Sequence, residues 1–253
     1  MEITASKQRQ RGGVRLALNR LDKLLADSGH FTRSEARSAI RAGRVTVDGA
    51  AARKPEEKFD ASQVEIRVDG EALNCTATRY YMLYKPAGVL SATDDPRQKT
   101  VLDLLPSALR RLGLFPVGRL DKDTTGLLLL TNDGEFAHRV ISPKKHVPKL
   151  YRAVLDGQPD AADVDAFAEG LALADGTACL PARLELPEEH VGRVTVYEGK
   201  YHQVKRMFAA RGYTVLALHR EQIGALPLDG ALQPGEFREL RPEEIERVFH
   251  ELL

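Results

Sequence analysis

The residues best suited to chemistry lie in one short segment, GRLDKDTTGLLLLTNDG, at positions 118–134. Arg119, Asp121 and Asp123 come directly before four consecutive leucines, which predict a buried strand over 127–130. Because an unpaired charge beside a buried strand is costly, the segment is either a surface turn or the polar edge of a reaction site. An ordinary aspartate is ionised at neutral pH, so Asp121 could act as a nucleophile or a general base.

A carboxylate in this position needs a cation, and the sequence offers two sources. Arg119 lies in the same segment. The segment YHQVKRMF, at positions 201–208, predicts a helix that carries Lys205 at the margin of its apolar face. The residues alone leave the pairing of Asp121 with Lys205 open against a surface ion pair between Arg119 and Asp121.

Several other reaction types lack their motifs. The chain has no G-x-G-x-x-G after a strand, no Walker-type loop, no G-x-S-x-G and no H-E-x-x-H. The stretch from Asp121 to Gly126 matches the first half of a calcium loop, but the twelfth position is Asn132 instead of the required glutamate. Neither the scattered histidines nor Cys75 and Cys179 have metal-ligand spacing. We therefore predict no metal and no cofactor.

Charge is distributed unevenly along the 253 residues. The first 54 carry 12 Lys and Arg against 5 Asp and Glu, whereas the rest carry 25 against 31, so the net charge of +1 conceals a basic first fifth. This asymmetry indicates a nucleic-acid contact surface, although a basic tail accounts for part of it. No apolar run approaches the roughly 20 residues of a membrane span. Two distant cysteines fit a reducing compartment, so we expect a cytoplasmic protein without membrane association.

A small module of helices and hairpins is predicted near the N-terminus. Leucines in LNRLDKLLADSG have helical spacing, and Thr32 and Glu35 have the spacing of a capping box that starts a second helix. The alternating segments RVTVDG and VEIRVDG then predict strands with Asp-Gly turns at 48–49 and 69–70. This arrangement, with TRSEARSAIRAGRVTVDG at its centre, resembles the S4 RNA-binding domain over roughly residues 19 to 66.

The second predicted helix carries three arginines at intervals of four residues, and a fourth lies just beyond its end; together they form a stripe. Like charges at this spacing destabilise a helix by about 0.3 kcal/mol per pair, so helix stability does not explain the stripe, and a solvated face usually mixes signs. The resemblance implies that this helix faces structured RNA. We predict phosphate contacts, with a solvated face as the alternative, for Arg33, Arg37, Arg41 and Arg44.

The rest of the chain mixes strand and helix patterns without a strict βαβ rhythm, which predicts an α+β fold with a mixed, mainly antiparallel sheet flanked by helices. Strands are expected at 127–130, 151–155, 193–197 and 215–219, and helices at 163–169, 201–211 and 242–253. The domains expected from the whole sequence are a basic flexible tail at 1–18, the S4 domain at 19–69, a linker at 70–79 and a catalytic domain at 80–253.

Four motifs in this second domain resemble those of the pseudouridine synthases of the RsuA type. GRLDKDTTGLLLLTNDG is similar to the family's catalytic motif. KPAG at 85–88, KLYRA at 149–153 and EGKYHQVKRMFAARGY at 198–213 agree with it in order and spacing. A preceding S4 domain is also the arrangement of this branch, and the resemblance covers almost the whole chain from about residue 19.

The resemblance implies roles for three catalytic residues. Asp121 matches the essential aspartate, Tyr151 the tyrosine that packs against the target uracil, and Lys205 the basic residue that pairs with the aspartate. Related branches carry Arg in place of this Lys, which supplies a point charge instead of a bidentate fork. The expected substrate-binding residues are Arg119, which matches an arginine near the flipped nucleotide, Val204, which matches the aliphatic residue on the other side of the base, Lys85 and Arg206.

The implied reaction breaks the bond between uracil N1 and ribose C1′, rotates the base and joins C5 to C1′, without a cofactor. Asp121 would either attack C1′ or remove a ribose proton towards a glycal, and the sequence leaves this choice open. The base must first leave its stack. The segments closest to the RsuA pattern imply a monomer that acts on uridine 516 of 16S rRNA or on assembling 30S particles. A 23S rRNA synthase and a non-catalytic ribosome-assembly factor are the alternatives.

Overall fold

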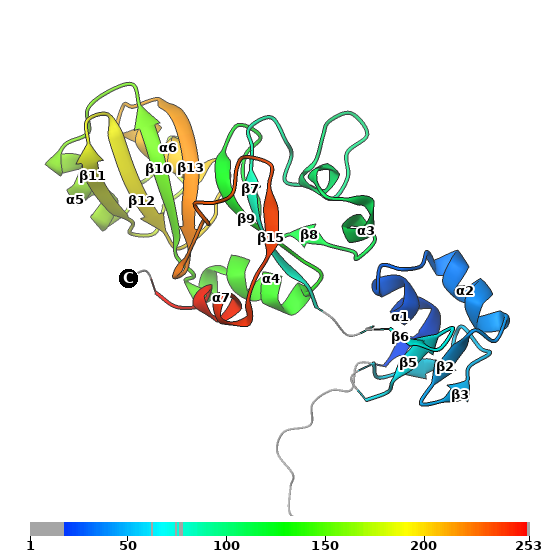
Figure 1. Ribbon diagram of the computed structural model, residues 1–253. Coiled ribbons are helices and arrows are strands. Elements are labelled where there is room, and N and C mark those ends of the chain that lie inside the picture. Colours follow the sequence, from blue (N-terminus) through cyan, green and yellow to red (C-terminus); the bar gives the residue numbers. More distant parts are fainter. Residues whose placement is uncertain (1–17, 62, 74, 76–77, 252–253) are drawn as a thin grey trace, which may run out of the picture. The chain divides into compact units, whose positions relative to one another are not determined.

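The computed structural model describes residues 18–61, 63–73, 75 and 78–251. The chain divides into two compact units, residues 1–77 and 78–253 (Figure 1). The predicted basic tail lies outside the described residues, apart from Leu18. Within the described part of the chain, no helix is long and apolar enough to cross a membrane.

The N-terminal unit contains two helices and several short strands. In chain order these are β1 (Asn19–Arg20), α1 (Leu21–Asp27), α2 (Arg33–Arg41), β2 (Val45–Val47), β3 (Ala50–Ala51), β4 (Lys58–Phe59), β5 (Ile66–Val68) and β6 (Glu71–Ala72). β2, β3, β5 and β6 form a sheet in the order β3-β2-β5-β6, and β1 pairs with β4. The apolar faces of α1 and α2 and the inward side chains of β2 and β5 share one core.

The local signals read from the sequence of this unit are confirmed. The Thr32 hydroxyl accepts a hydrogen bond from the Glu35 N–H, and the Glu35 carboxylate accepts one from the Thr32 N–H. Residues 48–49 and 69–70 all have positive φ, as turns between adjacent antiparallel strands require. The unit continues beyond residue 69, where a linker was expected, because β6 pairs with β5 and Leu73 packs on the core.

The second unit is built on a large mixed sheet. Its elements are β7 (Tyr80–Lys85), η1 (Val101–Leu104), α3 (Ser107–Arg110), β8 (Phe115–Pro116), β9 (Thr125–Thr131), α4 (Gly134–Ile141), η2 (Pro143–Lys145), β10 (Lys149–Leu155), α5 (Ala161–Glu169), β11 (Arg183–Glu188), β12 (Val191–Val196), α6 (Gln203–Ala210), β13 (Val215–Ile223), β14 (Leu226–Pro227), β15 (Phe237–Glu239) and α7 (Pro242–Arg247). The strand order is β11-β12-β10-β13-β9-β7-β15, with β14 beside β13 and β8 beside β9.

One parallel pairing joins two antiparallel halves of this sheet. β9 and β13 are parallel and every other pairing in the sheet is antiparallel, so the prediction of a mixed, mainly antiparallel sheet is confirmed. At the junction Gly126 faces Arg220. A Cβ atom at Gly126 would lie 2.3 Å from the Arg220 carbonyl oxygen, so only glycine allows this approach. Two strands from distant parts of the chain therefore meet beside the Asp121 loop.

The four leucines of β9 are buried on both faces of the sheet. Leu128 and Leu130 belong to one core, which includes residues of α5 and α6, whereas Leu127 and Leu129 belong to a second core with residues of α4. This explains why the strand is a continuous apolar run instead of an alternating one. α4 and α7 lie close together in the fold (Figure 1), and Phe136 of α4 packs against Phe249 just beyond α7.

Two elements differ from the sequence prediction near the ends of this run. The composition Asn-Asp-Gly at residues 132–134 predicts a turn, but Asp133 is instead the N-cap of α4, and its carboxylate accepts hydrogen bonds from the N–H groups of Glu135 and Phe136. The last helix ends at Arg247 instead of continuing to 253. The first difference arises because a residue that caps a helix also has the composition of a turn.

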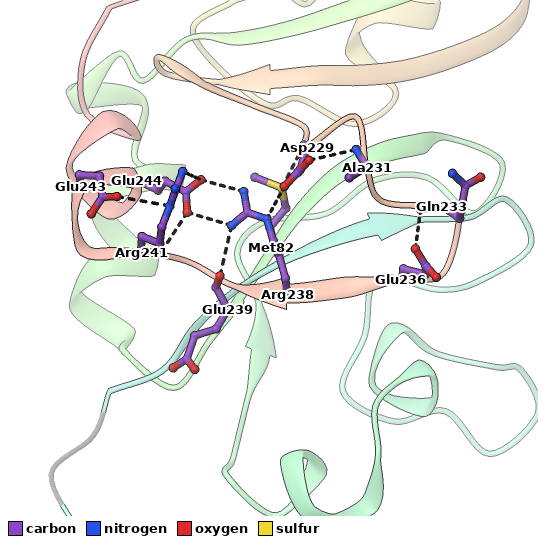
Figure 2. A network of polar contacts seen from close by, with 10 residues as sticks. All are labelled: Met82, Asp229, Ala231, Gln233, Glu236, Arg238, Glu239, Arg241, Glu243 and Glu244. Carbon is purple, nitrogen blue, oxygen red and sulfur yellow. Dashed lines mark hydrogen bonds and ion pairs between the residues drawn. The ribbon is translucent and has the colours of Figure 1, made fainter.

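A network of charged side chains ties β15 to α7 (Figure 2). Arg238 donates hydrogen bonds to Asp229 and to both carboxylate oxygens of Glu244, and Arg241 also donates to Glu244. Hydrogen bonds from Arg238 lower the pKa of Glu244 to about 2, although burial acts in the opposite direction. On its other side β15 pairs with β7, the strand that ends at Lys85.

Candidate active site

The loop that carries Asp121 is held from inside by a lysine. Lys85 is completely buried, and its ammonium group donates hydrogen bonds to the carbonyl oxygens of Pro86 (3.0 Å), Lys122 (3.2 Å) and Thr124 (2.8 Å). The Thr124 N–H also bonds to the Asp121 carbonyl oxygen at 3.1 Å. These contacts fix the backbone that follows Asp121 before β9 begins.

Two nitrogen-bearing side chains approach the Asp121 carboxylate, which remains 25% exposed. Nε2 of His202 lies 3.4 Å from one oxygen, and Nζ of Lys205 lies 3.4 Å from the other. Lys205 is closer to Asp123, at 2.6 Å, and this hydrogen bond lowers the pKa of Asp123. Lys205 is therefore shared between two carboxylates and holds Asp121 by charge more than by a short hydrogen bond.

Asp121 lies at a small open cavity of about 80 Å³. The cavity walls come from the Asp121 loop, the edges of β10, β12 and β13, and the start of α6. Among the residues expected from the sequence, the structure brings Arg119, Asp121, Tyr151 and Val204 to this cavity. Its other lining residues are Leu120, Thr124, Val196, Glu198, Gly199, Lys200, His202, Gln203 and Leu218.

Tyr151 is held in place by a buried arginine. The Tyr151 side chain on β10 is largely buried, and its hydroxyl oxygen accepts a hydrogen bond from Nη1 of Arg220 at 3.3 Å. Arg220 is 3% exposed, and its Nε donates to the Leu127 carbonyl oxygen at 2.7 Å. The guanidinium carbon lies 5.8 Å from the centre of the Tyr151 ring. Arg220 thus links the tyrosine to the start of β9.

Two residues that were expected to bind substrate are placed elsewhere. Lys85 has no exposed surface and uses its ammonium group on backbone carbonyls, so it supports the loop and does not line the cavity. Arg206 lies one position beyond Lys205 on α6 and forms an ion pair with Asp175. One step along a helix turns a side chain by about 100°, which explains why these neighbours face different surroundings.

Sequence reasoning did not identify four of the residues around this site. His202 was part of the quoted motif, yet nothing in its spacing predicted the contact with Asp121. Leu218 and Arg220 are two positions apart on β13 and both are buried. The side chain of Thr124 is buried in the loop. Period-two alternation in LHREQIG was the available signal for the two strand residues, but the partner of β13 could not be read from it.

The arginine stripe of α2 begins around a buried acid. Asp22 of α1 is fully buried and forms ion pairs with Arg20, Arg33 and Arg37 at 3.0, 3.6 and 2.9 Å. Burial alone raises the pKa of Asp22, but hydrogen bonds from Arg20 and Arg37 outweigh it and bring that pKa below its ordinary value. Arg33 and Arg37 therefore contribute to folding through Asp22. The repulsion between like charges within the helix does not describe this contribution.

The other two arginines of the stripe differ from these and from one another. Arg44 pairs with Asp69 across the hairpins. Arg41 forms no ion pair with any described residue and is exposed on the last turn of α2. Arg41 is thus the member of the stripe whose charge is most available to a phosphate.

No cluster of three or more His, Cys, Asp or Glu side chains that could hold a metal ion is found among the described residues. Cys75 and Cys179 are free thiols. Two pairs of opposite charges lie at the cavity, Asp121 with Lys205 and Glu198 with Lys200, and the His202 ring lies beside Asp121.

Comparisons with known proteins agree with this geometry. The family model described as RNA pseudouridylate synthase matches residues 79–210, and the S4 domain model matches residues 19–64. The Bacillus subtilis protein described as "uncharacterized RNA pseudouridine synthase YtzG" is 47% identical, covering 89% of this chain and 96% of its own length. "Ribosomal small subunit pseudouridine synthase A" of Escherichia coli is 43% identical, covering 90% and 99%. A crystal structure titled as that of a pseudouridylate synthase is 39% identical, covering 90% and 99%, with a TM-score of 0.65.

Proposed function

We propose that this protein isomerises uridine 516 of 16S rRNA. The premise is that the chain belongs to the RNA pseudouridine synthases and is an rRNA pseudouridine synthase of the RsuA type. It is accordingly an isomerase with an S4 RNA-binding domain. The proposal for the small subunit is supported by the names of relatives that match almost the full chain. We further propose that it acts as a cytoplasmic monomer on 16S rRNA or assembling 30S particles.

The observation that carries the catalytic assignment is the position of Asp121. Its carboxylate lies at a cavity bounded by the Tyr151 ring and the Val204 side chain, with His202 and Lys205 on its two oxygens. We assign Asp121 as the reacting carboxylate and Tyr151 and Val204 as the two surfaces between which an extruded uracil packs. An aromatic ring and an aliphatic side chain suit the two faces of a flat base.

Lys205 has a different task from Asp121 in this proposal. It orients Asp121 by its charge, while its shorter hydrogen bond to Asp123 fixes its own position. Arg119 at the rim contacts the RNA around the vacated stack. The ionised Asp121 then either bonds to C1′ or takes a proton from C2′, and both routes release uracil for rotation.

The S4 domain supplies affinity that does not depend on the reacting base. Phosphate contacts by Arg33, Arg37, Arg41 and Arg44 would position the RNA without reading its sequence. Arg41 is the most direct candidate among them because it has no ion pair with a described residue, whereas Arg33 and Arg37 share Asp22.

The test is a map of pseudouridines in 16S and 23S rRNA from cells that lack the protein. We expect one modification, at position 516 of 16S rRNA, to disappear and to return with the wild-type gene but not with Asp121→Asn. Loss of a pseudouridine from 23S rRNA instead would show that the substrate is the RNA of the large subunit. If neither RNA changes, the assignment of an rRNA substrate is overturned.

A further inference from the structure

A buried arginine without an acidic partner lies behind the catalytic cavity. Arg220 is 3% exposed and forms no ion pair with any described residue. Its Nε and Nη1 bond to neutral oxygens of Leu127 and Tyr151, and its Nη2 is buried with no hydrogen-bond partner in the structure. A guanidinium loses much hydration energy when it is buried in this way. Anchoring the Leu127 carbonyl alone does not require a charge.

Two further buried cations make this region positive. Lys85 bonds only to backbone carbonyls, and Lys149 on β10 bonds to the carbonyl oxygens of Val140 and Val147. Burial lowers the pKa of each lysine to about 8, and the charge of Arg220 acts in the same direction on both. The interior behind Tyr151 therefore contains positive charge that no buried carboxylate pairs with among the described residues.

The reaction moves a negative charge away from Asp121 by either route. If the carboxylate attacks C1′, it becomes an ester as the C1′–N1 bond breaks and its electron pair goes to N1. If it instead takes the C2′ proton, it becomes a neutral acid, the C1′–C2′ double bond forms, and the same pair goes to N1. In both cases one negative charge leaves Asp121 and appears on uracil, so cations are needed at two places.

We propose that Arg220 is the positioning residue for the uracil end of this charge transfer and acts through the hydroxyl of Tyr151. The inference rests on the proposed function. Because Arg220 donates to the phenol oxygen, the Tyr151 O–H hydrogen remains available for the uracil anion. A hydroxyl that accepts a hydrogen bond from a cation is a stronger donor itself. The charge of Asp121 is thus balanced by Lys205 before bond cleavage, and the charge of the uracil anion by Tyr151 and Arg220 afterwards.

The test compares two leaving groups in single-turnover reactions on the target RNA. The site carries either uridine or 5-fluorouridine, whose fluorine withdraws electrons and stabilises the base anion without help from the protein. Arg220→Met is expected to slow loss of uridine about 30-fold and loss of 5-fluorouridine only about fivefold. Arg220→Lys, which keeps the charge, should fall between Arg220→Met and the wild type. Equal slowing of both substrates by Arg220→Met would overturn the proposal.

Lys149→Met is the matched control, because Lys149 is also a buried cation bonded to neutral oxygens but has no hydrogen bond to Tyr151. It should leave the ratio of the two rates unchanged even if it lowers stability. A shift in that ratio as large as that of Arg220→Met would show a general effect of buried charge and overturn the specific role of Arg220.

A double-mutant cycle with Tyr151→Phe tests the route through the hydroxyl. In that background Arg220→Met should have little further effect on uridine cleavage, whereas additive losses would contradict the coupling. Should Arg220→Met not fold, Tyr151→Phe alone must change the ratio of uridine to 5-fluorouridine rates in the same direction. If wild-type protein converts no uridine at all, the proposed function fails instead, so the two failures are distinguishable.

Discussion

A buried charge in each unit of the molecule, Asp22 in the first and Lys85 in the second, lies at the centre of a polar cluster, and these two charges are compensated in opposite ways. In the N-terminal unit the buried Asp22 carboxylate forms ion pairs with three arginines, whose side chains are partly exposed to solvent. In the synthase unit the buried Lys85 ammonium donates hydrogen bonds to three carbonyl oxygens. Among the described residues, no carboxylate lies within ion-pair distance of it.

The pKa values show what this difference means. The surroundings of Asp22 favour its charged form, since the arginines outweigh the effect of burial. The surroundings of Lys85 disfavour its charged form, since burial lowers its pKa to about 8 despite the nearby Asp121 and Asp123. A fully paired charge stabilises a fold, whereas a partly compensated one leaves an electric field in the interior. The second arrangement lies beside Asp121, the carboxylate that we propose reacts, and the first lies in the S4 domain.

The largest effect that separates these arrangements is expected from Lys85→Met. Without the ammonium group the carbonyls of Lys122 and Thr124 are no longer held, and displacement of a reacting group by about 1 Å can cost about 100-fold in rate. We expect a loss of about that size in single-turnover pseudouridine formation. Stability should change by only about 1 kcal/mol, because the cost of burying the charge also disappears.

The matched control for Lys85→Met is Lys122→Met, which alters an exposed lysine of the same loop. Its rate should remain close to that of the wild type. A wild-type rate in Lys85→Met itself would show that the bonds to the carbonyls do not position Asp121.

Asp22→Asn should have the next largest effect, confined to the N-terminal unit. Loss of the charge-assisted hydrogen bonds is expected to lower the stability of this unit by about 2 kcal/mol, measured by hydrogen exchange of α1 and α2. Because the folded pKa lies below the ordinary value of 3.8, the contribution of Asp22 is complete above pH 4 and is lost as the pH falls further. Asp27→Asn, at an exposed pair with Lys23, should change exchange little, and an equal effect would contradict the central role of Asp22.

A smaller effect should distinguish two arginines of the α2 stripe. Arg41→Ala is expected to weaken RNA binding and to reduce the slope of log affinity against log salt by about 1, without changing stability. Arg37→Ala should weaken binding and also destabilise α2, because Arg37 bonds to Asp22. An unchanged salt slope in Arg41→Ala would remove the phosphate contact from this residue.

The last comparison concerns the pH dependence of the synthase unit. The unfolded chain has an ordinary lysine pKa of 10.5, while Lys149 titrates at about 8 in the folded protein. Between these pH values the unfolded state binds more protons, so stability rises with pH. The wild type should therefore gain unfolding free energy relative to Lys149→Met from pH 8 to pH 10. A constant difference between the two proteins would show that Lys149 titrates normally.

Local signals in the sequence were sufficient for much of the fold. The capping box of Thr32 and Glu35 and the Asp-Gly turns depend only on neighbouring residues, and each was found where it was predicted. The burial of the leucine run followed from composition. Asp133 was interpreted as part of a turn because the residues that cap helices are also those that form turns.

Only those site residues that belong to a recognised sequence motif could be predicted. Asp121, Tyr151 and Val204 meet at one cavity, as the family pattern implies. Arg220 was missed because its contacts depend on the parallel pairing of β9 with β13, whose paired residues are more than ninety positions apart. The surroundings of Lys85 depend on backbone carbonyls, which leave no mark in the identity of the residues that supply them.

The most direct test of the account is pseudouridine formation by Asp121→Asn under single-turnover conditions on 16S rRNA and 30S particles. The substitution keeps the shape of the side chain and removes its charge. We predict that the variant melts at the wild-type temperature, binds RNA with wild-type affinity and forms no detectable pseudouridine. Pseudouridine formation within about tenfold of the wild-type rate would contradict the assignment of Asp121 as the reacting group.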